Sequence, residues 1–181
     1  MDFTEKFVSR DDRFKGRIFS VSVDDIIQPD GKPSKREVVH HNGAVCVAPL
    51  TDDNTLAFVR QYRYPMAEVM LELPAGRIEP GEDPVETAKR ELIEEAGLTT
   101  IECIPFGVDY PTPGYSTEKI YLYGARIGGT CPTNPDEGEF VEKVYIPLAE
   151  AEEMAYDGTI TDSKTAMLVL RVAKAVREGR L

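Results

Sequence analysis

Histidine and cysteine are scarce in this chain. The only residues of these types are His40, His41, Cys46, Cys103 and Cys131. A zinc site normally needs four such ligands at close spacing, and the cysteines are far apart and form no C-x-x-C pair, so no zinc site is expected. Isolated thiols that serve as small core residues in a reducing compartment are the simpler interpretation.

Basic side chains are also in short supply. Lys and Arg number 21 against 32 Asp and Glu, which gives a formal net charge of −11. This charge repels polyanions at long range, and the chain has no basic block, so nucleic acid is not an expected partner. A small anionic substrate would need a local cation to offset the repulsion.

Long apolar runs are absent from the sequence. Residues 1–20 alternate charged and apolar side chains without the apolar core of a signal peptide, and no later window has transmembrane length. We therefore expect a cytoplasmic protein that binds no membrane. The 181 residues, 41% of them hydrophobic, suffice for one well-packed domain and a small appended subdomain.

The N-terminal part has the pattern of a small β-subdomain. Residues 14–24 and 36–41 look like strands on either side of the turn sequence QPDGKPS. Two short strands have little core of their own, so this subdomain must pack on something else. We place it at residues 1–42 and the main domain at residues 43–181.

The main domain alternates strand and helix patterns. The predicted strands lie at 43–50, 55–63, 68–77, 101–108, 117–127 and 140–148. The predicted helices lie at 84–96, 148–156 and 161–180. Several strands with one helix in the middle of the pattern and others at its end indicate an α/β fold of the α/β/α sandwich type.

The middle helix has the clearest boundaries. Asp83 suits the N-cap, Pro84 the first helical position and Gly97 a left-handed C-cap. The C-terminal helix is expected to begin after either Thr161 or Asp162.

The same middle helix gathers negative charge on one side. At about 100° per residue, Glu91, Glu94 and Glu95 face one sector. Arg90 cannot neutralise these three carboxylates and the nearby Glu82, so their repulsion calls for another cation. Mg²⁺ or Mn²⁺ would supply it, because both prefer carboxylate oxygens. Taken alone, an E-x-x-E-E triplet is more typical of a solvated acidic face.

The residues around the triplet change that interpretation. Residues 76–98 read GRIEPGEDPVETAKRELIEEAGL and fit the pattern G-x5-E-x7-R-E-U-x-E-E-x-G-U, where U is apolar. Such a match arises by chance on the order of once in ten million chains of this length. The chain therefore resembles the Nudix hydrolases. The resemblance implies a Nudix α/β/α sandwich with a mixed sheet that uses a divalent metal to hydrolyse a nucleoside diphosphate linked to another group.

The resemblance also implies roles for residues of this motif. Glu91 and Glu95 are the expected metal ligands, and Glu94 is a ligand or a near neighbour. Arg90 and Glu82 would orient these carboxylates. The expected cofactor is Mg²⁺, with Mn²⁺ as the alternative.

Segments outside the motif resemble bacterial ADP-ribose pyrophosphatases, a group of Nudix hydrolases. They are REVVHHNGAVCVAPL, FVRQYRYP, LELPAGRIEPGEDP and PTPGYSTEKIYLY. Pro113, in the last segment, matches the proline that marks the group, and we place it with the substrate-binding residues. The implied reaction is hydrolysis of ADP-ribose to AMP and ribose 5-phosphate.

Further site residues follow from this resemblance. The carbonyl of Ala75 would be another metal ligand, and Arg36 and Arg63 would meet the phosphates or ribose of the substrate. An aromatic residue such as Phe14 or Phe19 would stack on adenine. The simpler alternatives are a strand end at Ala75, surface salt bridges for the two arginines, and a core position for the aromatic ring.

Hydrolysis also needs a base, and carboxylates engaged by a metal are poorly suited to that task. In the resembled group the base lies on a loop before a late strand, and NPDEGEF at 134–140 looks like that loop. We expect Glu137 to be the base, with Glu139 as a metal ligand or the alternative base. A D-E-G-E turn is otherwise typical of a solvated loop.

The resemblance implies a homodimer that exchanges its N-terminal subdomains, in which case Arg36 would reach the partner's site. Two other functions stay open. One is hydrolysis of another nucleoside diphosphate sugar, such as GDP-mannose or ADP-glucose, because a motif does not encode the pocket contacts that select the sugar. The other is a sensor that binds a nucleotide without cleaving it, although such a module would be expected to lose the motif carboxylates.

Overall fold

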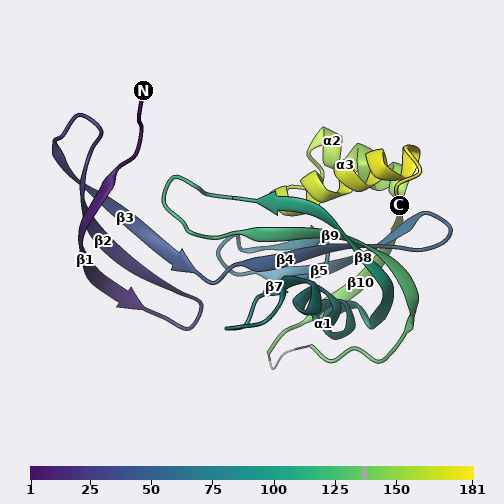
Figure 1. Cartoon of the computed structure of the whole chain (residues 1–181). Helices are drawn as coiled ribbons and strands as arrows, with labels where there is room; N and C mark the ends of the chain where they lie inside the picture. Colours follow the sequence, from purple (N-terminus) through teal and green to yellow (C-terminus); the bar gives the residue numbers. More distant parts are fainter. Residues whose placement is uncertain (136–137) are drawn as a thin grey trace. The chain divides into compact units, whose positions relative to one another are not determined.

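The computed structural model describes residues 1–135 and 138–181 (Figure 1). It divides into two compact units. The first contains residues 1–43 and 110–119, and the second contains residues 44–109 and 120–181. The first unit thus adds a short later segment to the subdomain that we propose at residues 1–42.

The first unit is built on a three-stranded antiparallel sheet in the order β1–β2–β3. Its strands are β1 (Lys6–Lys15), β2 (Phe19–Ile27) and β3 (Pro33–His41). The strand predicted at 14–24 is wrong at its start, because Gly16 donates to the carbonyl of Phe19 in a turn there. Strand β1 escaped prediction because all of its residues are exposed, so no apolar face marks it.

Residues 110–119 join the first unit through hydrogen bonds to β3. The amide of Val39 donates to the carbonyl of Tyr115 at 2.8 Å, and the amide of Thr117 donates to the carbonyl of Val39 at 2.9 Å. Pro113 lies in the turn just before these contacts. This segment therefore pairs with β3 although it follows a strand of the second unit in the chain.

Buried positions in the first unit are partly polar. Asp24, which is 7% exposed, accepts two hydrogen bonds from Arg10, at 2.9 and 2.8 Å, and one from Ser22 at 2.8 Å. The Arg10 contact holds the pKa of Asp24 at about 2, well below its usual range. Ser22 Oγ also lies 2.8 Å from His40 Nε2. Hydrogen bonds thus help to stabilise the first unit, where a larger domain would rely on apolar packing.

The second unit is built on a seven-stranded sheet whose path is β10–β5–β4–β9–β8, with β6 paired to β5 and β7 paired to β4. The strands are β4 (Ala44–Leu50), β5 (Thr55–Arg63), β6 (Glu68–Glu72), β7 (Ala75–Arg77), β8 (Leu98–Asp109), β9 (Ile120–Thr130) and β10 (Val141–Pro147). Strands β4 and β9 run parallel, whereas the other pairs are antiparallel. The predicted mixed sheet is therefore confirmed.

Helices cover both faces of this sheet. Helix α1 (Pro84–Ala96) lies on one face, and helices α2 (Leu148–Asp157) and α3 (Ser163–Arg177) lie on the other (Figure 1). The predicted α/β/α sandwich is confirmed. No helix in the described part of the chain is long and apolar enough to cross a membrane.

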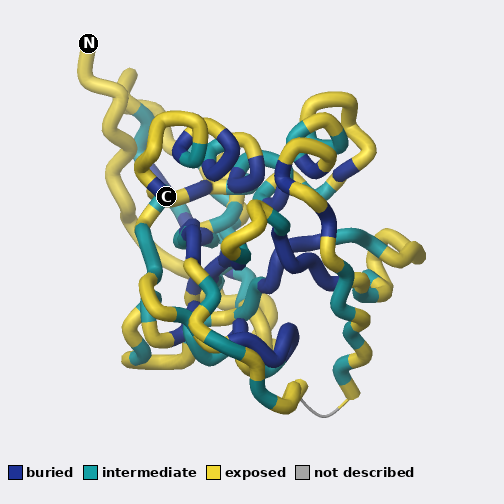
Figure 2. The backbone as a smooth tube through the Cα atoms, turned by 90° about the vertical axis from the view of Figure 1, so that its right-hand side faces the viewer, coloured by how far each residue is buried: buried dark blue, intermediate teal, exposed yellow. Residues whose placement is uncertain are grey.

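Strand β4 shows why the two layers hold together. Val45 and Val47 pack in a cluster with Leu92 of α1, whereas Cys46 and Ala48 belong to the larger cluster under α3. Alternate residues of a strand point to opposite faces, so β4 is apolar on both sides. Buried backbone accordingly runs through the central strands, while each helix alternates buried and exposed positions (Figure 2).

The two boundaries of α1 and the start of α3 agree with the sequence signals, whereas α3 ends at Arg177 and not at the predicted residue 180. Asp83 Oδ1 accepts from the amide of Val85 at 2.8 Å, and Gly97 ends α1 with φ 60°. At α3 the N-cap is Asp162, whose carboxylate accepts from the amide of Thr165 at 3.1 Å. That contact decides between the two predicted caps.

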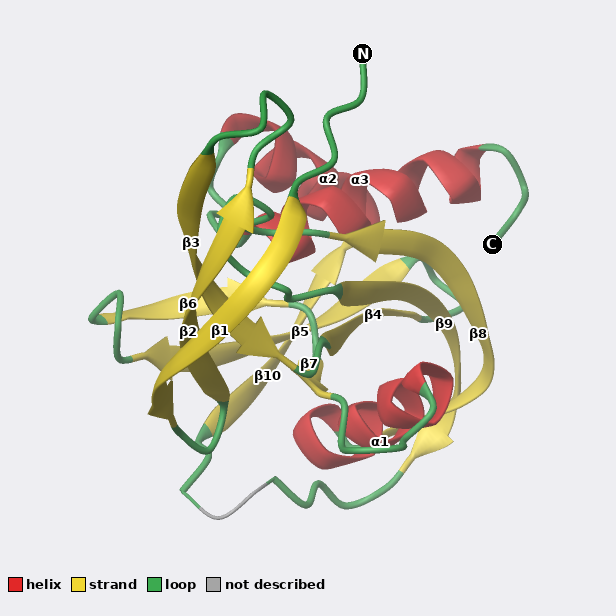
Figure 3. Ribbon diagram, turned by 60° about the vertical axis from the view of Figure 1, so that its left-hand side comes forward, coloured by secondary structure: helices red, strands yellow, loops and turns green. Residues whose placement is uncertain are grey.

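Three strand predictions in the second unit need correction. The single strand expected at 68–77 is split at Leu73 and Pro74 into β6 and β7, since Leu73 donates to Thr165 Oγ1 and proline has no amide hydrogen. The strands predicted at 101–108 and 117–127 are longer or displaced, as β8 and β9. These two strands bend strongly (Figure 3), and their pairing shifts register near Thr100 and near Pro105.

Leu92 is fully buried between α1 and the sheet, whereas its neighbour Ile93 is 39% exposed. Replacing Leu92 by Ala should lower the free energy of unfolding by about 2–5 kcal/mol, because it removes apolar contacts and leaves a cavity. The matched change Ile93→Ala should cost less than about 1 kcal/mol. Urea unfolding followed by circular dichroism measures both, and equal effects would contradict this packing.

Candidate active site

Helix α1 carries two carboxylates into the interior of the second unit. Glu91 is 7% exposed and Glu95 is 3% exposed, while Glu94 is half-buried. The solvated-face interpretation therefore fails for Glu91 and Glu95. Their partners must explain why the helix tolerates two buried acids one turn apart.

Arg90 ties the acidic residues of the motif together. Its Nε and Nη2 donate to the two oxygens of Glu82 at 3.0 and 3.1 Å. Its Nη1 donates to Glu91 Oε1 and to Glu94 Oε2, each at 2.7 Å. The Arg90 contact holds the pKa of Glu82 at about 2. One guanidinium thus fixes three carboxylates, which is the arrangement expected of an orienting residue.

The backbone of β7 lies directly against these acids. The amide of Ala75 donates to Glu95 Oε2 at 2.9 Å. A Cβ atom on Gly76 would lie only 1.9 Å from Glu91 Oε1, so only glycine leaves room for this carboxylate. The LPAG turn is therefore more than a strand end, because it forms one wall of the carboxylate site.

Burial raises the pKa of Glu91 to about 7, against the opposing charge of Arg90. Burial likewise raises the pKa of Glu95 to about 8, against the hydrogen bond from Ala75. The charge of Glu139 adds to both increases, so Glu139 lies close enough to act on both acids. Two buried acids that resist ionisation form a site that a cation would stabilise.

A divalent metal fits this donor set, since hard cations prefer carboxylate oxygens and Gly76 leaves room for the carboxylate of Glu91 beside β7. Within the described residues, no three His, Cys, Asp or Glu side chains are already arranged to hold a metal ion. Arg90 forms hydrogen bonds with two of the candidate ligands, Glu91 and Glu94. The residues that would hold a metal are Glu91 and Glu95, with Glu94 and the Ala75 carbonyl.

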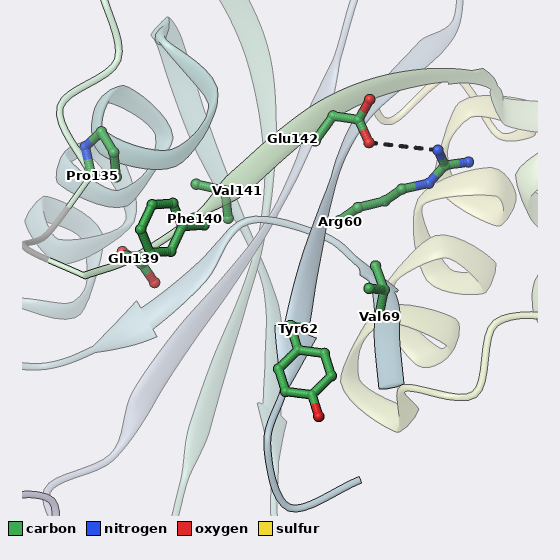
Figure 4. A pocket seen from close by; sticks show the side chains of 8 residues that line it. All are labelled: Arg60, Tyr62, Val69, Pro135, Glu139, Phe140, Val141 and Glu142. Carbon is green, nitrogen blue, oxygen red and sulfur yellow. Dashed lines mark ion pairs between the residues drawn. The ribbon is translucent and has the colours of Figure 1, made fainter. Parts of the chain in front are cut away.

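The loop before β10 contributes Glu139, whose Oε1 accepts from Gln61 Nε2 at 2.8 Å. Glu137, the base predicted from sequence, lies outside the described residues. A cavity of about 510 Å³ opens beside Glu139 (Figure 4). Its walls include Arg60, Tyr62, Val69 and Phe140.

Arg63, whose side chain is 38% exposed, pairs with a carboxylate that is buried, unlike the surface salt bridge considered from sequence. Its Nε and Nη2 donate to the two oxygens of Glu72 at 2.6 and 2.7 Å, and Lys164 donates to the same carboxylate at 2.6 Å. Burial would raise the pKa of Glu72, which is 2% exposed, but the two cations outweigh it and hold the pKa at about 2. Arg63 also opposes the raised pKa of Glu95, so it lies near the carboxylate site.

The other predicted substrate residues belong to the first unit. Arg36 forms an ion pair with Glu5. The ring of Phe19 lies 5.7 Å from that of Phe14, and both side chains are partly exposed. With Pro113, their described contacts lie within the first unit, so their roles in substrate binding stay predictions.

Sequence reasoning missed Gln61, which stands in FVRQYRYP between two residues of the cavity wall. Strand alternation was the available signal, because it places Gln61 and Arg63 on one face of β5 and Arg60 and Tyr62 on the other. The partner of Gln61 is 78 positions away in the chain, so no local pattern reveals the contact.

Comparison with known proteins identifies the fold family. A model of the NUDIX domain matches residues 39–168, which is most of the chain and includes the whole motif on α1. The chain belongs to the Nudix family. The Nudix interpretation of residues 76–98 is thereby confirmed.

Several curated proteins resemble this Nudix chain along most of their length. The methanol dehydrogenase activator of Bacillus methanolicus is 41% identical over 171 residues, covering 92% of this chain and 91% of the relative. The ADP-ribose pyrophosphatase of Bacillus subtilis is 35% identical over 167 residues, covering 91% and 90%. The GDP-mannose pyrophosphatase of Yersinia enterocolitica is 31% identical, covering 80% and 82%.

A solved structure supports the Nudix fold. The crystal structure of an ADP compounds hydrolase covers 100% of both chains with a TM-score of 0.86 at 24% sequence identity. At this identity the likeness concerns the fold, and it confirms the α/β architecture.

The raised pKa of Glu95 predicts a pH-dependent stability of the metal-free protein. Native Glu95 keeps its proton up to about pH 8, whereas the unfolded residue loses it near its ordinary pKa of 4.5. The contribution of Glu95 to stability therefore falls as the pH rises between these values. At about pH 9, Glu95→Gln should raise the free energy of unfolding by about 1–3 kcal/mol, because it removes a buried charge.

The gain from Glu95→Gln should shrink as the pH approaches about 5. Urea unfolding with a chelator present, at several pH values, measures it. The exposed Glu102→Gln serves as the control and should change stability by less than about 0.5 kcal/mol. A loss of stability in Glu95→Gln at high pH would show that its carboxylate is not strained by burial.

Proposed function

We propose that the protein hydrolyses the diphosphate of ADP-ribose to AMP and ribose 5-phosphate. The observation that carries this proposal is the pair of buried carboxylates, Glu91 and Glu95, held against the backbone of Ala75 and Gly76. They stand in the Nudix motif of a chain 35% identical to an ADP-ribose pyrophosphatase.

The reaction depends on a divalent cation, for which we propose Mg²⁺, with Mn²⁺ as the alternative. Glu91 and Glu95 would hold it, together with Glu94 and the carbonyl of Ala75. When bound, such a cation offsets the charge of the diphosphate and lowers the pKa of the attacking water. An acidic protein can then accept an anionic substrate through a cation that it has itself bound.

The protein's own side chains would orient the cation ligands, accept a proton and contact the substrate. Arg90 and Glu82 keep Glu91 and Glu94 in place, which supports a fixed geometry for the reacting groups. Glu137 would take the proton of the attacking water, with Glu139 as a ligand of the cation or the alternative base. Arg63 would interact with a phosphate oxygen or the ribose, and its two hydrogen bonds to Glu72 restrict its side chain beforehand.

A nucleoside diphosphate sugar is the substrate class that the relatives have in common where their names state one. Hydrolysis of GDP-mannose or a similar compound is therefore the second candidate, favoured by the 31% identical GDP-mannose pyrophosphatase. The 41% identical relative is named as an activator of methanol dehydrogenase. That name adds a third candidate, an effect on the activity of such a dehydrogenase.

The first experiment is a hydrolysis assay with Mg²⁺ and a panel of ADP-ribose, GDP-mannose, ADP-glucose and NADH. Release of AMP or GMP should be highest with ADP-ribose. Glu95→Gln should lower kcat by about 100-fold or more, because it removes a charged group of the cation site.

Preferential cleavage of another compound would keep the chemistry and reject the proposed substrate. Binding of ADP-ribose without turnover would instead favour the sensor. Adding the protein and its Glu95→Gln variant to a methanol dehydrogenase assay tests the third candidate.

We also propose that the protein is a cytoplasmic homodimer formed through the first unit, with no membrane or nucleic acid partner. The small apolar core of the first unit supports this, because Ile26 is its one buried hydrophobic residue among those described. Large apolar side chains of the same unit, among them Phe7 and Phe14, are more than half exposed.

Light scattering on the purified protein should give twice the chain mass of 20.1 kDa. Phe7→Ser and Phe14→Ser together should shift the mass toward that of one chain, because they remove apolar surface from the proposed interface. Exchange of Tyr156, an exposed aromatic residue of the second unit, for Ser is the control and should leave the mass unchanged. A single-chain mass for the unmodified protein would reject the dimer.

A further inference from the structure

Gln61 lies on the face of β5 that α1 covers. Ala57, four residues earlier on the strand, packs in a cluster with Ala96, the last residue of α1, and Leu98, the first residue of β8. Alternate residues of a strand share a face, so Ala57, Gln61 and Arg63 all point to this side. Gln61 therefore belongs to the same layer as the carboxylates of the Nudix motif.

The two ends of the Gln61 amide have different environments. Nε2 donates to Glu139 Oε1 at 2.8 Å. Oε1 is buried and has no hydrogen-bond partner in residues 1–135 and 138–181. Turning the amide round would place an oxygen against a carboxylate oxygen, so the contact with Glu139 sets the orientation.

This arrangement is unfavourable for stability alone. A buried acceptor without a partner loses its hydrogen bonds to water and gains none in return. Methionine has a similar length and would fill the same space without a buried polar atom. The glutamine must therefore be explained by what its donor end does, and that end meets Glu139.

Glu139 lies in the loop before β10, whose first residue is Val141, so strand pairing does not hold it. A hydrogen bond from another segment of the chain is needed to fix its side chain. The backbone of Val141 pairs with Gln61 itself, so one residue of β5 fixes both the start of β10 and the carboxylate two positions earlier. The same segment of the chain contacts α1 directly: the amide of Asn134 donates to the carbonyl of Glu94 at 3.1 Å, and Lys143 Nζ donates to the carbonyl of Ala96 at 2.6 Å. The carboxylate that Gln61 holds thus lies on the α1 side of the sheet, which is the side of the motif acids.

We infer that Gln61 is a positioning residue, which holds Glu139 toward Glu91 and Glu95 so that Glu139 completes the carboxylate set for the divalent cation. This inference rests on the proposed metal-dependent function. It assigns to Gln61 no contact with substrate, because Gln61 acts through Glu139. Replacing Gln61 should therefore weaken binding of the cation without lowering the stability of the fold.

The decisive variant is Gln61→Met, studied in the full chain with Mn²⁺ as the probe. Electron paramagnetic resonance of free Mn²⁺ measures the dissociation constant without any substrate. We expect Gln61→Met to weaken Mn²⁺ binding about 5- to 20-fold, while its melting temperature in the metal-free state stays equal or rises. Gln28→Met makes the same change in the first unit and should leave Mn²⁺ binding within about twofold.

A double-variant cycle tests whether Gln61 acts through Glu139. Glu139→Gln alone should weaken Mn²⁺ binding, and adding Gln61→Met to it should change the constant by less than about twofold. In the hydrolysis assay, Gln61→Met should lower kcat at saturating Mn²⁺ with KM within about twofold.

Three results would overturn the inference. The first is Mn²⁺ binding by Gln61→Met within twofold of the unmodified protein. The second is a double variant whose Mn²⁺ dissociation constant rises by the product of the two single effects. The third is a lower melting temperature of Gln61→Met with unchanged Mn²⁺ affinity. An unmodified protein that binds no Mn²⁺ would reject the inference together with the metal-dependent function. The expected Mn²⁺ constants without hydrolysis of any compound in the panel would reject the enzymatic function and leave the role of Gln61 standing.

Discussion

Two acids pressed against a backbone are the constraint on which this structure depends. Glu91 and Glu95 can reach β7 only if α1 keeps its rotation and depth, and Gly76 and the amide of Ala75 receive them only if β7 keeps its pairing with β4. Burial of these carboxylates opposes folding, so apolar contacts elsewhere in the second unit must stabilise the arrangement. The site is therefore a strained part of a well-packed layer, which is typical of functional sites.

The charges around the site are paired in two different ways. Arg90 reaches its acids from the same helix and motif, so its network is local. Glu72 instead joins Arg63 of β5 to Lys164 of α3, and so connects the α1 side of the sheet with the helix on the opposite face. Both networks are satisfied by hydrogen bonds, which is what keeps buried charges tolerable. Within residues 1–135 and 138–181, the acids of the cation site are the exception, because Glu95 forms no ion pair and Glu91 shares Arg90 with Glu82 and Glu94.

Local signals in the sequence were enough for α1 and for the fold class. Asp83 and Gly97 act on their immediate neighbours, so their capping roles can be read from spacing, and the motif that contains them identified the family. Strand β1 could not be found this way, because its residues are exposed on both sides. The contact of Gln61 with Glu139 joins distant segments, and only the pairing of β5 with β10 brings them together. The contact thus follows from strand pairing in the folded protein, which the periodicity of the sequence does not reveal.

The segment that pairs with Val39 has a wider consequence. Because residues 110–119 leave the second unit after β8 and return to it at β9, the chain crosses between the units three times. The first unit is thus not a detachable N-terminal module: cutting the chain before Ala44 would strip Tyr115 and Thr117 of their backbone partners. A recombination event that transfers residues 1–43 alone would leave residues 110–119 behind. Both segments must therefore be transferred together for the first unit to stay intact.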